Sequence, residues 1–474
     1  MLTADCCMLT RDIAASIFDK LRKQTGADEI ELLISNGRSA LTRFANNTIH
    51  QNVAEEETHI SVRVSFGGRS ARATTNKHDD ESLRRVLQSA EALARVQQDD
   101  SDLLPMPTPE EVTENAKQSG ASRVKRHFES TARLTANDRA AAVARMVEQA
   151  KKHSLTSAGI FSSSEGVEGI FNSRGVQDWY EQSLAEASVT MIGDTSSGWQ
   201  KANHPDAAQL DPARLAEVAA QKAIASRNPR ELPPGKYTVI LEPAAVLDAV
   251  GFMFWDFSGS ALLEQRSFLN DRIGSQLFGE NITVWDDVYH PLQTGLTFDG
   301  EGMKRHRLKL IEKGVVQRVT FARASAARVQ QSKLASDVGH VTPTGHGFAL
   351  PNEIGEAPLN IVFEGPEPAT RRSLEQMIAS TERGILVTRL WYIREVDPYE
   401  KILTGMTRDG TFLVENGKIQ FGIRNFRFNE SLIHMLQNVE AMSEPVRSSG
   451  EESTDMVVPA MTVRDFNFTE TTKF

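Results

Sequence analysis

Hydrophobic residues in the first half of the chain follow two different periodicities, one typical of helices and one typical of strands. Apolar residues at helical spacing predict helices over 9–24, 81–93 and 138–153. Apolar residues that alternate with polar ones predict strands over 29–34, 41–49, 59–66, 157–164, 166–173 and 185–193. The Ser-rich stretch 162–166 and residues 172–175 are predicted turns between the later strands. This pattern indicates an α+β region in which helices pack on an antiparallel sheet.

The second half begins after the clearest boundary in the sequence. Residues 228–235, NPRELPPG, contain three prolines and a glycine, which end both helices and strand ladders. Beyond them, glycine-punctuated strand patterns predominate, and these predict a β-rich, mostly antiparallel and strongly curved C-terminal domain. With the proline-containing connector near residue 105, they predict three parts: 1–110, 111–230 and 231–474.

One strand-to-helix unit starts the C-terminal part. Tyr237, Val239 and Leu241 alternate as in a strand, Glu242-Pro243 ends it, and an Ala- and Leu-rich helix follows. The first turns of a helix after a strand hold side chains firmly, so this unit is a natural place for a reactive group. Its aromatic residues Phe252, Phe254, Trp255 and Phe257 have the spacing of a buried face or of a dimer contact.

Composition excludes several classes of protein. The formal net charge is −10, with 53 Lys and Arg against 63 Asp and Glu, which argues against a nucleic-acid binder. Runs of about 18 apolar residues are lacking, so no membrane association is expected. The two cysteines, Cys6 and Cys7, cannot build a disulfide framework. The N-terminus lacks the pattern of a signal peptide, so a cytoplasmic location is expected.

An ordered set of segments along nearly the whole chain resembles the TldD/PmbA family, also known as modulators of DNA gyrase. The segments are 26–28, 67–69, 162–169, 232–241, 285–287, 298–302, 311–314, 342–345, 382–385, 410–417 and Asn429. The resemblance implies an α+β N-terminal region, a β-rich C-terminal domain, and paired subunits around an enclosed cleft for unfolded or leader-type peptides. It also implies that a TldD-type subunit carries zinc on an HExxxH helix, whereas the TldE/PmbA-type partner lacks that motif.

The family's zinc motif has a degenerate match in this chain. Residues 247–252, LDAVGF, have its spacing, with Leu247 and Phe252 at the two histidine positions and Asp248 at the position of the base. Leucine and phenylalanine cannot bind zinc, and the late cysteine ligand of the family is absent as well. The resemblance therefore predicts a non-catalytic, TldE-like partner without a cofactor of its own. Asp248 is either a general base or a polar residue on an exposed helix face.

A glycine-rich loop is the rival site. His340 and His346 could hold a metal, but the loop has no acidic residue or cysteine to complete three ligands. The resemblance makes it instead a loop that lines the peptide cleft, with Thr344, Gly345, His346 and Gly347 as candidate peptide-binding residues. Glu301, in the tight turn Asp299-Gly-Glu-Gly302, is a further candidate that shapes the cleft, although acidic residues and glycines are also what ordinary turns select.

Three hypotheses follow. The first is a non-catalytic subunit of a heteromeric metallopeptidase, most simply a heterodimer with a zinc-bearing TldD-type chain. The second is a peptide-binding scaffold that forms homodimers or larger homo-oligomers and hydrolyses nothing. The third is an active peptidase with a relocated His340/His346 site.

Overall fold

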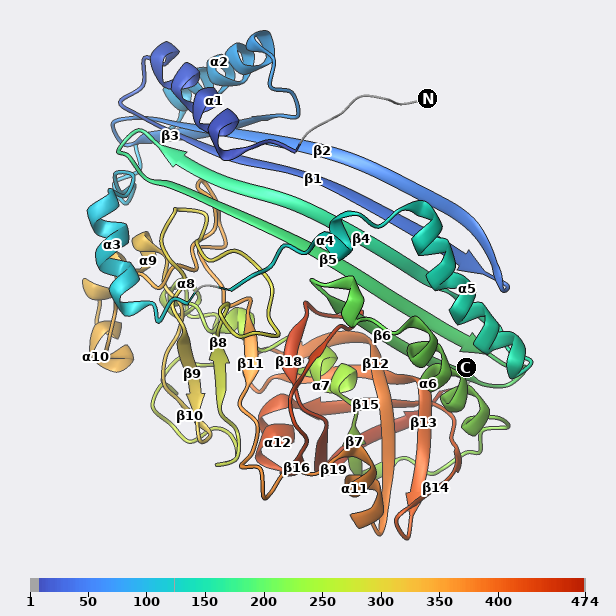
Figure 1. Cartoon of the computed structure of the whole chain (residues 1–474). Coiled ribbons are helices and arrows are strands. Elements are labelled where there is room, and N and C mark those ends of the chain that lie inside the picture. The colour runs from blue at the N-terminus through green and yellow to red at the C-terminus, as the bar shows by residue number, and fades with distance from the viewer. Residues whose placement is uncertain (1–7, 123, 473–474) are drawn as a thin grey trace.

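One six-stranded antiparallel sheet forms the frame of the N-terminal half (Figure 1). The structure is a computed structural model that describes residues 8–122 and 124–472, so Cys6 and Cys7 lie outside the described residues. The strand order is β3-β2-β1-β4-β5-β6. The strands are β1 (Glu29–Ala45), β2 (Thr48–Phe66), β3 (Arg69–Thr75), β4 (Thr156–Asn172), β5 (Gln177–Ile192) and β6 (Ser197–His204).

Four of these strands are unusually long. β1, β2, β4 and β5 have 17, 19, 17 and 16 residues, against a usual five or six. The predicted turn at 162–166 is wrong, because β4 runs through it without interruption. The physical reason is pairing: Ser164 lies opposite Ser39 of β1 and Gly166 opposite Gly37, so the neighbouring strand satisfies the backbone of this serine- and glycine-rich stretch.

Helices cover one face of the sheet at its two ends, as Figure 1 shows. At one end, α1 (Arg11–Gln24) and α2 (Asp80–Val96) bury Phe18 and Leu87 against β1, β2 and β3. At the other end, α5 (Ala136–Lys152) and α6 (Pro212–Ala225) pack on Phe44, Phe161 and Val189. The connection carries α3 (Pro109–Gln118) and α4 (Glu129–Ala132), and η1 (Ala207–Gln209) precedes α6. The predicted helix-on-sheet region is confirmed.

The C-terminal half contains two more sheets. One has the order β10-β9-β8-β11-β18-β17; the other has the order β12-β7-β19-β15-β13-β14, and β12 also pairs with β13, which closes five strands into a ring. This confirms the β-rich, strongly curved domain. Its strands are β7 (Gly235–Leu241), β8 (Val284–Asp286), β9 (Leu308–Glu312), β10 (Val315–Val316), β11 (Ile361–Phe363), β12 (Arg383–Asp397), β13 (Ile402–Glu415), β14 (Lys418–Gly422), β15 (Phe426–Ser431), β16 (Val439–Met442), β17 (Val446–Ser448), β18 (Met456–Val458) and β19 (Met461–Thr471).

Short helices connect these strands. They are α7 (Pro243–Val250), η2 (Phe254–Asp256), α8 (Gly259–Leu263), α9 (Arg323–Gln330), α10 (Leu334–Val338), α11 (Leu374–Ser380) and α12 (Leu432–Gln437). Among the described residues, no helix is both long and apolar enough to cross a membrane.

The second face of the long sheet, called here the inner face, is turned towards the C-terminal domain. Leu33, Ile170 and Tyr180 on this face pack against Leu296 and Phe298. β1 and β4 pair from Glu31↔Asn172 to Phe44↔Gly159, so the parts before and after residue 110 share one sheet. The division into 1–110, 111–230 and 231–474 stays a prediction.

Candidate functional site

The strand-to-helix unit lies at the centre of the C-terminal domain. β7 pairs with β12 on one side and with β19 on the other, which fixes the start of α7. Glu242 ends the strand and Pro243 occupies the first turn of the helix, where its missing N–H costs nothing. α7 is buried on every side from Ala245 to Val250, so it is an internal helix.

The two positions that the resemblance assigns to zinc ligands hold no donor atoms. Leu247 is 0% exposed and belongs to the main hydrophobic core of the domain, and Phe252 is packed against the edge of that core. The segment 449–453 closes over this place: a Cβ at Gly251 would overlap Ser453, and one at Gly450 would overlap Leu247 and Asp248. Within residues 8–122 and 124–472, no three His, Cys, Asp or Glu side chains are placed to hold a metal ion. The site does not fit zinc.

Asp248 joins α7 to two other segments. Its Oδ1 accepts hydrogen bonds from the backbone N–H groups of Glu451 and Glu452, both 3.3 Å long, and its Oδ2 accepts one of 3.3 Å from Leu390 of β12. It is 0% exposed, so the expectation of an exposed helix face is wrong. The physical reason is that both the Glu451–Glu452 backbone and β12 cover this side of α7 and supply donors to the carboxylate.

The pKa of Asp248 gives a test of this environment. Burial raises it to about 7, although the backbone donors favour the ionised form. Between about pH 4 and 7 the folded state therefore holds a proton that the unfolded state has lost, so stability falls as the pH rises through this window. We expect wild type to lose on the order of 3 kcal/mol relative to Asp248→Asn between pH 4 and 8 in urea unfolding. For the control Asp19→Asn, at an exposed position, the difference in unfolding free energy from wild type should not change with pH. If that difference were also constant for Asp248→Asn, the raised pKa of Asp248 would be contradicted.

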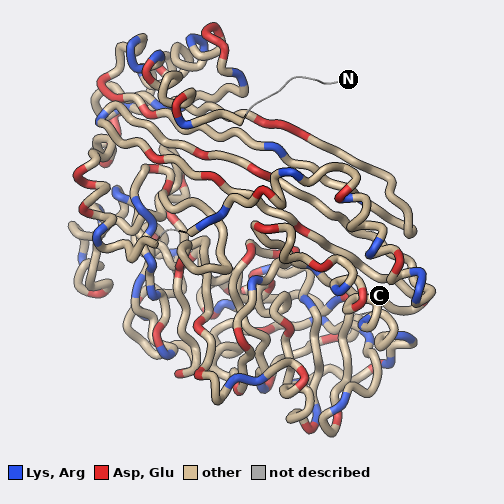
Figure 2. Tube along the Cα trace, in the orientation of Figure 1, with Lys and Arg blue, Asp and Glu red and all other residues tan. Residues whose placement is uncertain are grey.

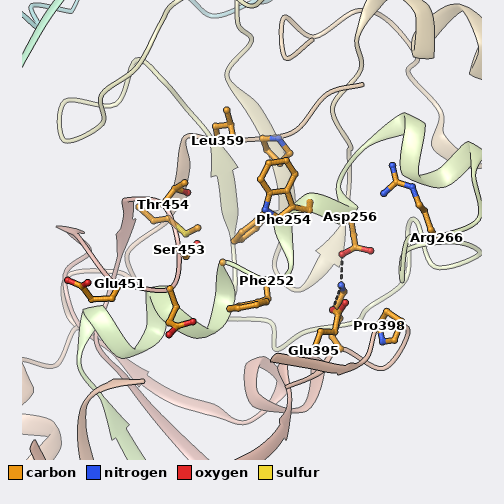
Figure 3. A pocket seen from close by; sticks show the side chains of 16 residues that line it. Phe252, Phe254, Asp256, Arg266, Leu359, Glu395, Pro398, Glu451, Ser453 and Thr454 are labelled. Atoms are coloured by element: carbon orange, nitrogen blue, oxygen red, sulfur yellow. Dashed lines mark hydrogen bonds and ion pairs between the residues drawn. The ribbon is translucent and has the colours of Figure 1, made fainter. Parts of the chain in front are cut away.

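A cavity of about 660 Å³ opens beside the C-terminal end of α7 (Figure 3). Its wall combines the aromatic rings of Phe252, Phe254 and Trp255 with charged groups. Within that wall the buried Lys401 ammonium lies 2.5 Å from Asp256 and 2.6 Å from Glu395. Apolar rings next to polar groups in a concave site are typical of ligand pockets.

The glycine-rich loop contributes the rim of this region rather than its wall. Trp255, 50% exposed, stacks on Phe348, the residue that follows Gly347, with ring centroids 6.4 Å apart. Thr344, Gly345, His346 and Gly347 themselves are buried beneath that rim. In the single chain these four residues therefore support the stacked pair of exposed Trp255 and half-buried Phe348, and have little surface of their own.

His346 has both ring nitrogens engaged. Its Nε2 lies 3.0 Å from Asp286 Oδ1, and its Nδ1 lies 3.0 Å from Thr344 Oγ1. The Thr344 hydroxyl is in turn fixed by the backbone of Phe321, accepting from its N–H at 2.8 Å and donating to its carbonyl at 3.1 Å. Thr344 is thus not an activated nucleophile, and His346 has no free nitrogen for a metal. His340, by contrast, is exposed.

Glu301 and the glycine-rich loop lie next to each other in the structure. Both were predicted to line or shape the peptide cleft. The Gly347 N–H donates to Asp299 Oδ2 at 2.8 Å, and a Cβ at Gly347 would lie 2.6 Å from Glu301 Oε1. Glu301 accepts a 3.1 Å hydrogen bond from the Arg323 N–H. Burial raises the pKa of Glu301, and the Asp299 carboxylate raises it further. Asp299 and Glu301 therefore form a buried, partly neutral carboxyl pair under the loop.

Several residues of this region escaped prediction from the sequence. Asp286 stands in the short acidic stretch Asp286-Asp287, and its partner His346 lies 60 positions later in the chain. Lys401, Glu395 and Asp256 are equally dispersed. Local sequence patterns contain no signal for ion pairs between residues that only the tertiary fold brings together. A single Lys or Asp within an apolar stretch does indicate, however, that a buried partner exists.

Family models match three parts of the chain. The models are described as PmbA/TldA metallopeptidase domain 1 (residues 30–94), central domain (129–227) and C-terminal domain (234–470). Two relatives are similar in sequence. A metalloprotease PmbA homolog of Haemophilus influenzae is 21% identical over 92% of this chain and 94% of its own length, and metalloprotease PmbA of Escherichia coli O157:H7 is 24% identical over 69% and 70%.

The crystal structure of TldE from Thermococcus kodakarensis has the same fold. It aligns with a TM-score of 0.82 and 19% sequence identity, over 96% of this chain and 100% of that one.

Proposed function

Because this chain belongs to the PmbA/TldA metallopeptidase family, we propose that it is a non-catalytic, TldE-like subunit that completes the peptide cleft of a zinc-bearing TldD-type partner. One observation carries the proposal. The β7–α7 unit is intact and firmly held, yet the two ligand positions are Leu247, inside the core, and Phe252, at the cavity wall. A chain that keeps the architecture and lacks every donor is suited to shaping a site and not to activating water.

The cavity beside α7 supports a role in peptide handling. An unfolded or leader-type peptide offers alternating side chains and a polar backbone. The aromatic rings of Phe252 and Trp255 suit the first, and the Lys401–Asp256–Glu395 cluster suits the second. We propose that Glu301 and Thr344–Gly347 hold the aromatic rim in position, and that Phe348 and Trp255 make the direct contacts.

Exposed apolar side chains favour a partner subunit next to the cavity. Trp255, Tyr392, Val396 and Tyr399 are each about half exposed; Trp255 belongs to the cavity wall, and the other three lie in or just after the end of β12 beside the wall residues Glu395 and Pro398. Such side chains are enriched at the centres of protein interfaces. The partner is a TldD-type chain in a heterodimer or a higher hetero-oligomer, with a homodimer as the alternative, and we place the complex in the cytoplasm.

Zinc content and hydrolysis test the proposal together. The chain would be purified alone and together with an HExxxH-bearing family member, and zinc would be measured by mass spectrometry alongside cleavage of an unfolded peptide. We expect less than 0.1 zinc per chain and no cleavage for the chain alone, and chelator-sensitive cleavage for the pair. The His340→Ala variant should leave the result unchanged, since His340 is exposed and no metal site needs it.

The other outcomes decide between the remaining hypotheses. Stoichiometric zinc together with cleavage by the isolated chain would overturn the proposal. Loss of that zinc and of the cleavage in His340→Ala would then establish the relocated His340/His346 site. Failure to form a mixed complex, together with peptide binding by a homo-oligomer that cleaves nothing, would establish the scaffold.

A further inference from the structure

A channel runs along the inner face of the long sheet, in the direction of the strands. Two adjoining hollows of about 380 and 290 Å³ mark it, and they share Ser39, Glu55 and Ser164. Strand register gives its cross-section, because directly paired residues point to the same face. The successive rows from β2 to β5 are His59–Ser35–Glu168–Tyr180, Glu57–Gly37–Gly166–Gln182, Glu55–Ser39–Ser164–Leu184 and Val53–Leu41–Ser162–Glu186.

In each row the two central residues, on β1 and β4, have mostly small side chains, and the two outer residues, on β2 and β5, have longer ones. Over most of the channel the floor, on β1 and β4, consists of serine and glycine, so that a ligand can approach the backbone closely. The walls are the longer side chains of β2 and β5. With strands roughly 4.8 Å apart the two walls stand about 14 Å from each other, and the four rows span about 20 Å. That space accommodates an extended peptide of about six residues.

The channel is strongly acidic. Glu55 and Glu57 line one wall, Glu168 stands on the floor, and none of these three carboxylates has a hydrogen-bond or ion-pair partner among the described side chains. Figure 2 shows the acidic stretch of β2 as a continuous red segment. Arg38 belongs to the opposite face and pairs with Glu165 at 2.6 Å, and Lys201 is taken by Glu186 at 3.4 Å. His59 is the remaining basic group in the rows.

Protection of the sheet edge explains only part of this pattern. Residues 48–59 of β2 pair with β1 on one side and, in the described part of the chain, have no strand on the other, since β3 ends at Thr75, opposite Ile60. Charged residues on such an edge prevent pairing with a second copy. Yet Glu168 lies on β4, an interior strand, and an edge does not require a floor of serine and glycine two strands away. The same negative charge that repels a second acidic β2 attracts a strand of opposite charge.

We propose that this channel binds an extended, basic peptide segment, whose backbone lies on the Ser/Gly floor and whose Lys or Arg side chains reach Glu55, Glu57 and Glu168. This site is separate from the cavity beside α7. It rests on the proposed function only in that the ligand is a peptide. Binding requires no partner subunit and no zinc, so either proposal can fail without the other.

Fluorescence anisotropy of the full chain tests the channel. The probe is a fluorescein-labelled Lys-Ser-Lys-Ser-Lys-Ser peptide, compared with Glu-Ser and all-Ser peptides of equal length, at low and at moderate salt. We expect only the lysine peptide to bind, with an affinity that falls as salt rises. Glu57→Gln should weaken binding roughly threefold and Glu55→Gln/Glu57→Gln about tenfold, since partly exposed charge pairs contribute modestly. Ser164→Phe, which fills the floor, should abolish it.

Glu56→Gln is the matched control. It removes the same charge from the same exposed strand, but the side chain points to the opposite face, in register with Arg38, and binding should be unchanged. Equal weakening by Glu56→Gln would mean unspecific attraction to an acidic surface and would overturn the proposal. So would equal binding of the all-Ser peptide, or a self-association of the chain that Ser164→Phe abolishes.

Discussion

His346→Ala is expected to destabilise the C-terminal domain by about 3–5 kcal/mol, because it leaves the carboxylate of Asp286 buried without its imidazole partner. Asp286 Oδ1 lies 3.0 Å from His346 Nε2, and Oδ2 accepts a 2.9 Å hydrogen bond from the Asn360 N–H. Burial alone would raise the pKa of Asp286, but the neighbouring His346, followed by Arg305, lowers it below its usual value. The ionised carboxylate therefore depends on this contact.

The variant also loses the anchor of the glycine-rich loop, since Thr344 and His346 share a hydrogen bond. Urea unfolding would give the change in stability, and hydrogen exchange of the amides in β8 and β11 would show whether it is localised. His340→Ala, in the same loop but exposed, should change stability by less than about 0.5 kcal/mol. Similar losses for the two variants would show that His346 is not the partner on which Asp286 depends.

The fold class was predictable because its signals are local. Alternation in β1, β2 and β5 and helical spacing in α1, α2 and α5 are visible within short windows, and tertiary packing kept these element types. Only the boundary is wrong for the predicted strand 41–49, which crosses the turn between β1 and β2. The continuity of β4 was not predictable. Residues 162–166, SSSEG, have the composition of a turn, and only the neighbouring β1 makes them a strand.

The strand-to-helix unit of the site could be predicted from the sequence, but the contacts of its side chains could not. The spacing of Leu247 and Phe252 could be compared with a motif, whereas the burial of Asp248 depends on segments more than 140 positions later in the chain. One signal was nevertheless present. The run Ala244-Ala-Val-Leu-Asp-Ala-Val250 is apolar around the whole helix apart from Asp248, and such helices lie inside a domain. An internal helix excludes an exposed face for its one acidic residue.

The buried network under the loop also explains why its glycines matter. Gly345 and Gly339 both have a positive φ, of 72° and 77°, and Gly339 has a ψ of −102°. Their surroundings differ: a Cβ at Gly345 would overlap the carbonyl group of Lys304, while a Cβ at Gly339 meets nothing within 4 Å. The backbone at Lys304 cannot yield easily, because the adjacent His306 N–H donates to the Thr344 carbonyl at 2.9 Å and ties the two segments together.

Replacing each of these two glycines by alanine should therefore separate the cost of backbone strain from the cost of steric overlap with the Lys304 carbonyl group. Gly339→Ala is expected to cost about 1–3 kcal/mol, the strain of this positive-φ conformation for a residue with a Cβ. Gly345→Ala also places a Cβ at positive φ and must in addition push two backbone segments apart, so we expect a loss of more than about 3 kcal/mol in urea unfolding, larger than that of Gly339→Ala. The displaced segment includes the Thr344–His346 contact, so we expect exchange in β8 to rise, as we also expect for His346→Ala. Equal losses for the two alanine variants would mean that the loop can move away from Lys304, and that the rim beneath Phe348 is adaptable.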